Sequence, residues 1–161
     1  MQLSEVHAVL LELDAAGCRT WVAGGWGVDA LGGHQTRAHR DLDLTVDAED
    51  MSAALLVLQR RGYRIETDWR PVRVELVCVD VGRVDLHPVV FEDYGHGQQA
   101  GFDGAHFDYP PAAFDVGTLD GVGVPCLSRA QQLSFHAGYE LRPVDLHDLQ
   151  LLHALAAGPA G

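Results

Sequence analysis

Two spacings of apolar residues divide this chain into candidate helices and strands. Val6, Val9, Leu10 and Leu13 recur at the interval of an amphipathic helix, which predicts a helix over about residues 4–16. Further helices are expected at residues 26–31, between Asp47 and Gly62, from Ser128 onward, and at residues 144–156. Short runs of β-branched and apolar residues predict strands at residues 19–23, 40–46, 63–67, 72–79, 83–90 and 122–127.

Residues 92–116 follow neither spacing. They are rich in Gly, Asp, Tyr and Pro, and we interpret them as a long loop or an irregular hairpin. Loops of this length in a compact domain are commonly functional. By contrast, Asp80, Val81 and Gly82 separate two apolar runs and predict a tight hairpin.

The order of these elements is helix, strand, helix, strand, helix, several strands and two helices. This order predicts an α+β fold with a mixed sheet of about five strands, flanking helices and a short C-terminal helical pair. We expect residues 1–127 to form the α/β core and residues 128–157 to form a helical segment packed on it, within one compact domain.

Charge and cysteine content narrow the classes of protein that fit. Eleven Lys and Arg against 23 Asp and Glu give a net charge of −12, which opposes binding to nucleic acid. Cys18, Cys78 and Cys126 are an odd number without metal-ligand spacing, so reduced thiols are expected. The chain shows no basic leader and no apolar run of membrane-spanning length, so we expect a cytoplasmic protein without a membrane partner.

The most informative positions are Asp41 and Asp43, one residue apart in an otherwise apolar run. Side chains of a strand alternate between its two faces, so both carboxylates point the same way while Leu42 and Leu44 point into a core. Two neighbouring carboxylates repel each other unless a cation lies between them, and oxygen ligands favour Mg²⁺. The pattern therefore predicts a metal-dependent phosphoryl or nucleotidyl transferase.

A glycine pair and two arginines lie close to the aspartate strand in sequence. Gly24 and Gly25 follow a strand and precede a helix, where backbone N–H groups can approach phosphate oxygens. Arg37 and Arg40 suit a triphosphate, although pairing with the acidic surface is an equal interpretation.

A third carboxylate is expected on a neighbouring strand. Asp85 is a lone acid among apolar residues and could bind metal, act as general base on the acceptor hydroxyl, or do both. Glu75 on the partner strand is the second candidate base, and His87 shares a strand face with Asp85.

Other chemistry-bearing residues give weaker signals. The nine histidines form no zinc motif, and we interpret His136, His147 and His153 as packing or surface residues. The dipeptide His147-Asp148 lacks the further ligands of a metal phosphohydrolase. Trp26, Trp69 and Tyr139 could stack on a base or drug ring, but large aromatic residues are more often core residues.

With these residues in place, the chain resembles the small antibiotic nucleotidyltransferases of the polymerase-β superfamily. The resemblance lies in WVAGGWGVDALGGHQTRAHRDLDLTV (21–46), DWRPVRVEL (68–76), VDLHPV (84–89) and VPCLSRAQQLSFHAGYELRPVDLHDLQLL (124–152). It is greatest with the short lincosamide nucleotidyltransferases, and aminoglycoside 2″-nucleotidyltransferase is a more distant relative. Residues 92–116 match poorly, and we expect them to border the acceptor site.

The resemblance implies a nucleotidyltransferase fold and transfer of AMP from ATP to a drug hydroxyl, with two Mg²⁺ ions. It places Asp41, Asp43 and Asp85 at the metal site. It also implies that Gly24, Gly25, Trp26 and Arg37 lie at the nucleotide phosphates. From the residues themselves we add Arg40 to the nucleotide side, and we regard Glu75, Trp69, His87 and Tyr139 as possible acceptor-site residues. Two alternatives stay open: another acceptor such as an aminoglycoside, and a catalytically silent nucleotide-binding or antitoxin-like protein. A homodimer also fits, because family enzymes can build the acceptor site across a subunit interface.

Overall fold

The computed structural model describes residues 1–136 and 140–156. The first half of the chain contains α1 (Leu3–Ala15), β1 (Thr20–Val22), α2 (Gly24–Gly32), β2 (Asp41–Asp47), α3 (Met51–Arg60), β3 (Arg64–Trp69) and β4 (Arg73–Cys78). The second half contains β5 (Gly82–Phe91), β6 (Gly97–Ala100), β7 (His106–Tyr109), β8 (Phe114–Leu119), β9 (Val122–Leu127), α4 (Arg129–Phe135) and α5 (Pro143–Ala156). The predicted α+β class is confirmed.

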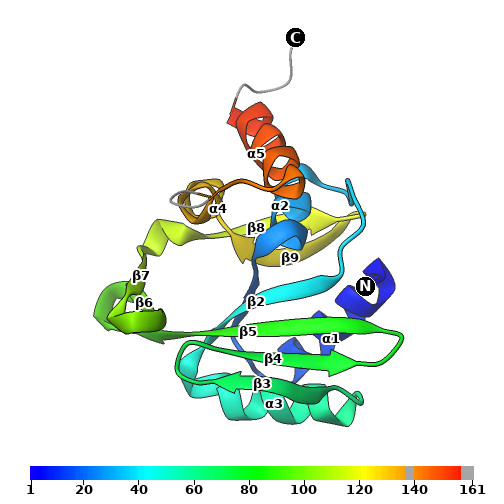
Figure 1. Ribbon diagram of the computed structural model, residues 1–161, viewed down its shortest axis with the longest axis vertical. Coiled ribbons are helices and arrows are strands. Elements are labelled where there is room, and N and C mark those ends of the chain that lie inside the picture. Colours follow the sequence, from blue (N-terminus) through cyan, green and yellow to red (C-terminus); the bar gives the residue numbers. More distant parts are fainter. Residues whose placement is uncertain (137–139, 157–161) are drawn as a thin grey trace.

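Seven strands form the main path of one mixed sheet, in the order β3-β4-β5-β2-β1-β9-β8. The central pair β2–β5 is parallel, and β1 runs antiparallel to β2 but parallel to β9. The hairpin β6–β7 extends from the far end of β5, away from the main sheet (Figure 1).

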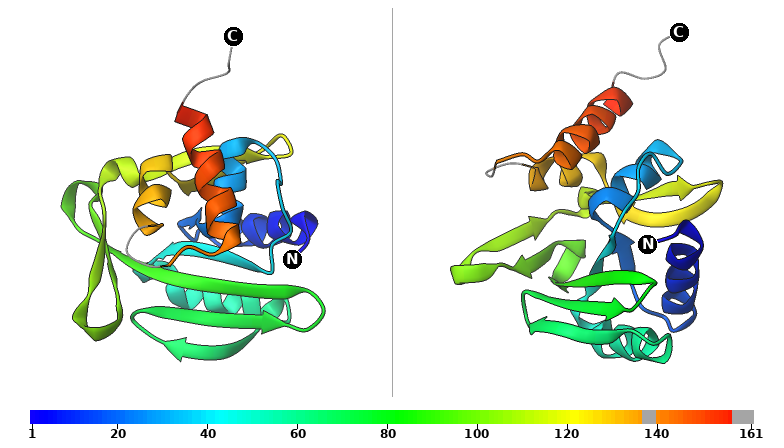
Figure 2. Two further views of the ribbon diagram at one scale, coloured as in Figure 1. Left: turned by 45° about the horizontal axis from the view of Figure 1, so that its top comes forward. Right: turned by 45° about the vertical axis from the view of Figure 1, so that its right-hand side comes forward.

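Helices cover the two faces of the sheet unequally. Helices α1 and α3 pack on the face that carries Leu42, Leu44 and Val46, which are fully buried in the main core. Helices α2, α4 and α5 gather at the other side, near β8 and β9 (Figures 1 and 2). The face that carries Asp41 and Asp43 is therefore backed by a solid core but opens toward these three helices.

Local sequence accounts for several element boundaries. Gly17 and Gly62 follow α1 and α3 in the left-handed region, at φ +76° and +91°, as expected of helix-ending glycines. The Ser128 hydroxyl accepts a hydrogen bond from the Gln131 amide and so caps α4, which was expected to begin at this residue. Asp47 instead caps a short 3₁₀ turn at Ala48–Asp50, immediately before α3.

The prediction of about five strands was wrong, because the sheet has nine within the described residues. The error lies in residues 92–116, which contain β6, β7 and the first part of β8. These strands are short or exposed and are interrupted by tight turns, so they show little alternation of apolar and polar residues. Strand β8 finds its partner, β9, across only a two-residue turn.

The C-terminal helices pack against α2 and against each other. The expected division between residues 127 and 128 stays a prediction, and residue 157, its expected end, lies outside the described residues. Within the described ranges, no helix is long and apolar enough to cross a membrane.

Candidate active site

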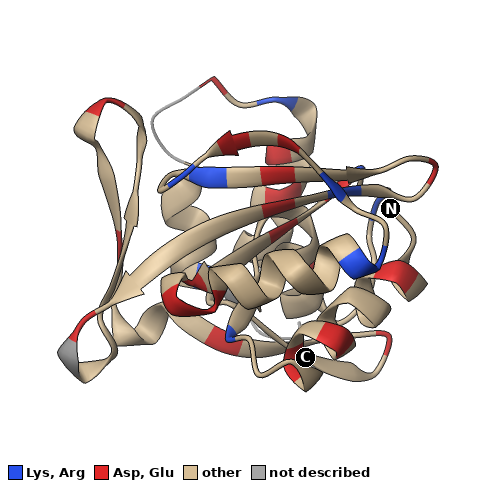
Figure 3. Ribbon diagram, turned by 90° about the horizontal axis from the view of Figure 1, so that it is seen from below, with Lys and Arg blue, Asp and Glu red and all other residues tan. Residues whose placement is uncertain are grey.

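Strand pairing brings four acidic residues onto one face of the sheet. Asp43 on β2 lies directly opposite Asp85 on β5, and Asp85 lies opposite Glu75 on β4. Asp41 lies one position further along the same face of β2. We call these four residues the carboxylate row, which appears as acidic segments on adjoining strands in Figure 3. The predicted meeting of Asp41, Asp43 and Asp85 follows from the parallel register of β2 and β5.

Asp85 lies in the centre of the carboxylate row and has an unusual environment. Burial raises the pKa of Asp85 to about 6, and repulsion from the Asp43 carboxylate adds to the effect. The nearby His87 acts in the opposite direction. A carboxylate with a pKa near 6 is still ionised at neutral pH but is a better proton acceptor than an ordinary aspartate.

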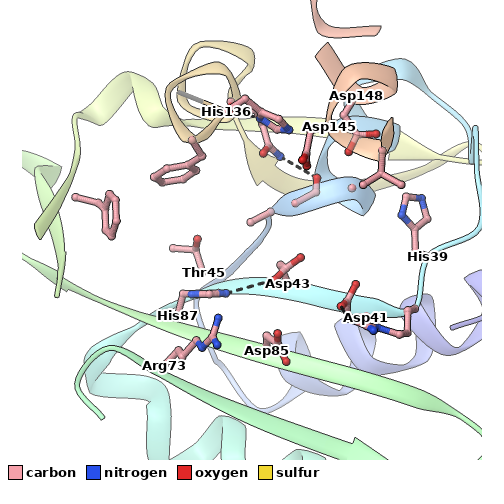
Figure 4. Close-up of a pocket in the computed structure, with 18 of the residues that line it drawn as sticks. His39, Asp41, Asp43, Thr45, Arg73, Asp85, His87, His136, Asp145 and Asp148 are labelled. Carbon is pink, nitrogen blue, oxygen red and sulfur yellow. Dashed lines mark hydrogen bonds and ion pairs between the residues drawn. The ribbon is translucent and has the colours of Figure 1, made fainter. Parts of the chain in front are cut away.

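The carboxylate row forms the floor of a cavity of about 930 Å³. Figure 4 shows Asp41, Asp43 and Asp85 on the sheet, with His136, Asp145 and Asp148 facing them from the helical side. The β6–β7 hairpin adds Gln99, Phe102, Phe107 and Tyr109 to the wall. This volume is at the upper end for small-molecule sites, so the cavity has room for two ligands side by side.

The glycine pair lies where the N-terminus of α2 meets the carboxylate row. Gly24 has φ +56°, and a Cβ atom built there would lie 2.2 Å from Asp43 Oδ2. A Cβ at Gly25 would lie 2.3 Å from Arg37 Nη2 and 2.6 Å from His39 Nδ1. Only glycines allow α2 to begin this close to a carboxylate and a guanidinium.

The Trp26 side chain is placed differently from the prediction. It is 1% exposed, belongs to the main core and packs against His39 at a tilt, with ring centroids 4.4 Å apart. Among the described residues that line the cavity, Gly24 and Gly25 are present but Trp26 is absent. Its indole therefore supports the cavity wall and does not face a ligand.

The two predicted nucleotide-side arginines are held in different ways. Arg37 donates from Nε and Nη2 to the two carboxylate oxygens of Asp148, at 2.9 and 2.7 Å. The Arg40 side chain is 84% exposed, and its Nη2 lies 3.4 Å from Asp41. Both line the cavity, but only Arg37 is fixed in it.

The predicted acceptor-side residues cluster around an unpredicted arginine. Arg73 forms an ion pair with Glu75 at 2.7 Å, and its guanidinium lies over the Trp69 ring, 4.8 Å from the centroid. Trp69 makes an edge contact with Phe102 at 5.5 Å. Glu75 is thus neutralised by Arg73, which weakens the case for Glu75 as a base.

His87 is connected to the hairpin by a chain of side chains. The Tyr109 hydroxyl donates to Gln99 Oε1 at 2.6 Å, which turns the Gln99 amide nitrogen toward His87 Nδ1, 3.4 Å away. The other ring nitrogen of His87 lies 3.4 Å from Asp43 Oδ1. His87 thereby connects the hairpin to the carboxylate row. Tyr139, the remaining predicted acceptor residue, lies outside the described residues.

Comparison with known proteins gives a consistent result. Residues 5–152 match the family model described as aminoglycoside-2″-adenylyltransferase. A lincosamide resistance protein of Staphylococcus haemolyticus is 37% identical over 135 residues, which cover 84% of this chain and 84% of that protein. The chain belongs to the aminoglycoside-2″-adenylyltransferase family.

Solved structures agree with this membership. A lincosamide antibiotic adenylyltransferase with bound lincomycin has a TM-score of 0.88 at 34% identity, covering 96% of this chain and 98% of that one. ANT(2″)-Ia in complex with adenylyl-2″-tobramycin has a TM-score of 0.72 at 22% identity, which shows a shared fold. A 2″-aminoglycoside nucleotidyltransferase of Escherichia coli is 33% identical over 64 residues, 40% of this chain and 36% of that protein.

Membership of the family makes the chain a nucleotidyltransferase, an enzyme that takes a nucleotide donor. The predicted resemblance is confirmed. Several residues around the cavity were nevertheless missed from sequence, because they belong to residues 92–116 or to the two C-terminal helices. In these segments they include Gln99, Phe102, Phe107, Tyr109, Phe135, Asp145 and Asp148, and Arg73 on β4 was missed as well. Only the capping of α4 at Ser128 and the dipeptide His147-Asp148 were visible as signals.

Proposed function

We propose that this protein transfers AMP from Mg-ATP to a hydroxyl of a lincosamide antibiotic and releases pyrophosphate. The observation that carries the proposal is the meeting of Asp41, Asp43 and Asp85 beneath the glycine-rich start of α2, in one large cavity. The 37%-identical lincosamide resistance protein and the similar lincomycin-bound adenylyltransferase support the acceptor class.

The donor atoms fit magnesium. Asp41, Asp43 and Asp85 offer only carboxylate oxygens, and Mg²⁺ in nucleotide enzymes is held by one or two carboxylates together with phosphate oxygens and water. Within residues 1–136 and 140–156, no three Asp, Glu, His or Cys side chains are arranged so that they could hold a metal ion by themselves. Such a set of protein ligands suits metal ions whose remaining ligands come from the triphosphate. When bound, two such ions would neutralise charge on the phosphates and on the departing pyrophosphate.

Asp85 is the proposed general base. Its carboxylate takes the proton from the acceptor hydroxyl as that oxygen bonds to the α-phosphorus of ATP, and the bond from this phosphorus to the pyrophosphate oxygen breaks in line. The raised pKa of Asp85, about 6, favours this proton transfer near neutral pH. The Asp43 carboxylate lies directly opposite Asp85 and keeps this part of the cavity negatively charged.

The nucleotide phosphates are proposed to lie against the start of α2. Gly24 and Gly25 expose backbone N–H groups at a helix N-terminus, which attracts phosphate through its dipole. Arg37 lies against Gly25, and the exposed Arg40 beside Asp41 can turn toward the triphosphate tail.

The opposite side of the cavity favours a lincosamide over an aminoglycoside. Two of its acids are already paired with arginines: Glu75 with Arg73, and Asp145 with Arg142. A polycationic aminoglycoside needs several available carboxylates. The exposed rings of Phe102 and Phe107, with Trp69 nearby, suit an acceptor that has an apolar part and a single basic nitrogen.

The remaining expectations stay predictions. They are ATP as donor, a cytoplasmic location, the absence of a nucleic-acid partner, a homodimer, and the acceptor roles of Trp69, His87, Glu75 and Tyr139. The aminoglycoside alternative keeps the same chemistry. If the protein were catalytically silent, the unfavourable ionisation of the buried Asp85 would serve no function.

Pyrophosphate release tests the proposal. The purified protein is incubated with Mg-ATP and, in parallel, with lincomycin, clindamycin, kanamycin and tobramycin, and each drug is then examined by mass spectrometry. We expect AMP to be added to the lincosamides. Addition to kanamycin or tobramycin alone would overturn the acceptor assignment, and no release with any drug despite Mg-ATP binding would favour the silent alternative.

A further inference from the structure

The last helix holds the loop that leads into the aspartate strand at two points. Residues 33–40 connect α2 to β2 and run past α5 (Figure 2). Arg37 donates two hydrogen bonds to Asp148, and the Thr36 hydroxyl lies 2.9 Å from His147 Nε2. We call these four residues the clasp. His147 and Asp148 are consecutive in α5 but 111 positions from their partners.

The ion pair between Arg37 and Asp148 is the stronger contact of the clasp. Asp148 is 3% exposed and Arg37 lies at the cavity wall, so the two charges meet largely away from water. The hydrogen bonds to Asp148 raise the pKa of Arg37 above its ordinary value. A carboxylate that accepts two bonds from one guanidinium fixes its plane as well as its position. Removal of either partner would leave the other charge buried and unpaired.

The second contact of the clasp, between Thr36 and His147, is connected through Thr36 to α2. The Thr36 hydroxyl donates to Asp29 Oδ1 at 2.6 Å, so it accepts from His147 Nε2–H. His39 Nε2 donates to Asp29 Oδ2 at 2.5 Å. Burial would raise the pKa of the fully buried Asp29, but the hydrogen bonds from His39 and Thr36 hold it below its usual value. Loop 33–40 is therefore tied to α2 on one side and to α5 on the other.

The clasp determines where Arg37 lies relative to the phosphate-binding start of α2. Arg37 Nη2 lies 2.3 Å from the position that a Cβ of Gly25 would take. Asp148 holds the Nε–Nη2 edge of the guanidinium, which leaves Nη1 near the Ala38 carbonyl at 3.4 Å. A guanidinium held by one edge keeps its remaining N–H groups for an oxyanion.

We propose that Asp148, assisted by His147, is a positioning residue of the nucleotide half of the active site, acting by fixing Arg37 against Gly25. This inference rests on the proposed function, because it assumes that the triphosphate lies at Gly24 and Gly25. It assigns a task in the reaction to α5, whose His147 was expected to be a packing or surface residue.

A double-mutant cycle tests the proposal. Asp148→Asn, Arg37→Ala and the double variant are compared with the wild type for Mg-ATP binding by calorimetry without acceptor. We expect Asp148→Asn to weaken Mg-ATP binding about tenfold, the scale of a misplaced charged contact. In the Arg37→Ala background the same change should add less than about twofold, because Asp148 then has nothing to position.

Glu5→Gln is the matched control. Arg61 also donates two hydrogen bonds to one carboxylate, that of Glu5, and this partly buried ion pair is remote from the cavity. This variant should lose thermal stability without a change in Mg-ATP affinity. Where turnover is measurable, Asp148→Asn should raise KM for ATP and leave KM for the acceptor within about twofold.

Three results would overturn the inference. They are unchanged Mg-ATP affinity in Asp148→Asn, equal losses in the wild-type and Arg37→Ala backgrounds, and an equal loss of affinity in Glu5→Gln. If Asp148→Asn does not fold, Asp148→Glu keeps the charge but shifts the guanidinium, and it should still weaken Mg-ATP binding. Because binding is measured without a drug, a wrong acceptor assignment leaves this test intact.

Discussion

The floor and the outer wall of the cavity are built in contrasting ways. The floor consists of β2 and β5, paired over seven consecutive positions in the middle of the sheet, with Leu42, Leu44, Val84 and Leu86 fully buried beneath. The wall is the β6–β7 hairpin, which joins the sheet through only two residue pairs with β5. Its Phe102 and Phe107 are 52% and 43% exposed.

This difference separates two tasks. Charged groups that must meet with sub-ångström accuracy lie on central strands, where a slip of one residue would bury the acids and expose the leucines. Groups that select an acceptor lie on a peripheral hairpin, where changes have little effect on the core. We therefore expect floor substitutions to abolish chemistry and wall substitutions to change acceptor recognition.

The largest effect is expected at the floor. Asp43→Asn removes a charge from the proposed metal site and should lower the rate of pyrophosphate release by at least about a thousandfold. Circular dichroism and the melting temperature should stay close to those of the wild type, because Asp43 faces the cavity. A variant that retains more than about a tenth of the wild-type rate would contradict the metal role.

Gly24→Ala should come next. The added methyl group would collide with Asp43, and alanine would have to adopt the unfavourable φ of +56°. We therefore expect turnover to slow by about a hundredfold and the free energy of unfolding to fall. Gly121→Ala is the control, because Gly121 has φ +82° but no heavy atom within 4 Å of the added Cβ. It should share the backbone strain of about 1 kcal/mol and keep the rate. Equal activity in the two variants would refute the close contact.

Asp85→Asn should lose turnover but gain stability. The pKa of Asp85 is about 6 in the folded protein against 3.8 ordinarily, so ionisation at neutral pH opposes folding. Denaturant unfolding with EDTA at pH 7.5 should show a gain of about 1 kcal/mol, a value reduced for partial solvent access. The gain should shrink as the pH falls through 6 toward 4, because wild-type Asp85 then takes up its proton. A stability gain that grows as the pH falls would contradict a raised pKa of Asp85.

The smallest effect is expected at the wall. Phe102→Ala should raise KM for a lincosamide about tenfold, the value of one lost aromatic contact, and leave KM for ATP and the melting temperature unchanged. Tyr94→Ala is a suitable control, because Tyr94 is 97% exposed and is absent from the cavity lining. If the two variants behave alike, the hairpin does not contact the acceptor.

The floor was predictable from sequence and the wall was not. Asp41 and Asp43 stood out because alternation along one strand is a local property, and Asp85 stood out as a lone acid among apolar residues. Phe102 and Phe107 showed no comparable pattern, because exposed residues in a short hairpin need not alternate. Trp26 gave an ambiguous signal, because a tryptophan beside two glycines can form a ligand platform, although large aromatic residues are more often core residues.

Local sequence patterns were enough to predict the α+β class, the approximate helix and strand boundaries along most of the chain, and the acids that share a strand face. These features depend on neighbours within a few residues, where periodicity and backbone preferences act. The three-dimensional fold was needed to show that Asp85 lies opposite Asp43 and that Arg73 neutralises Glu75. It was also needed to show that His147 and Asp148 contact Thr36 and Arg37. Such contacts join positions that are distant in sequence, and packing of the whole core selects among the many pairings that local patterns allow.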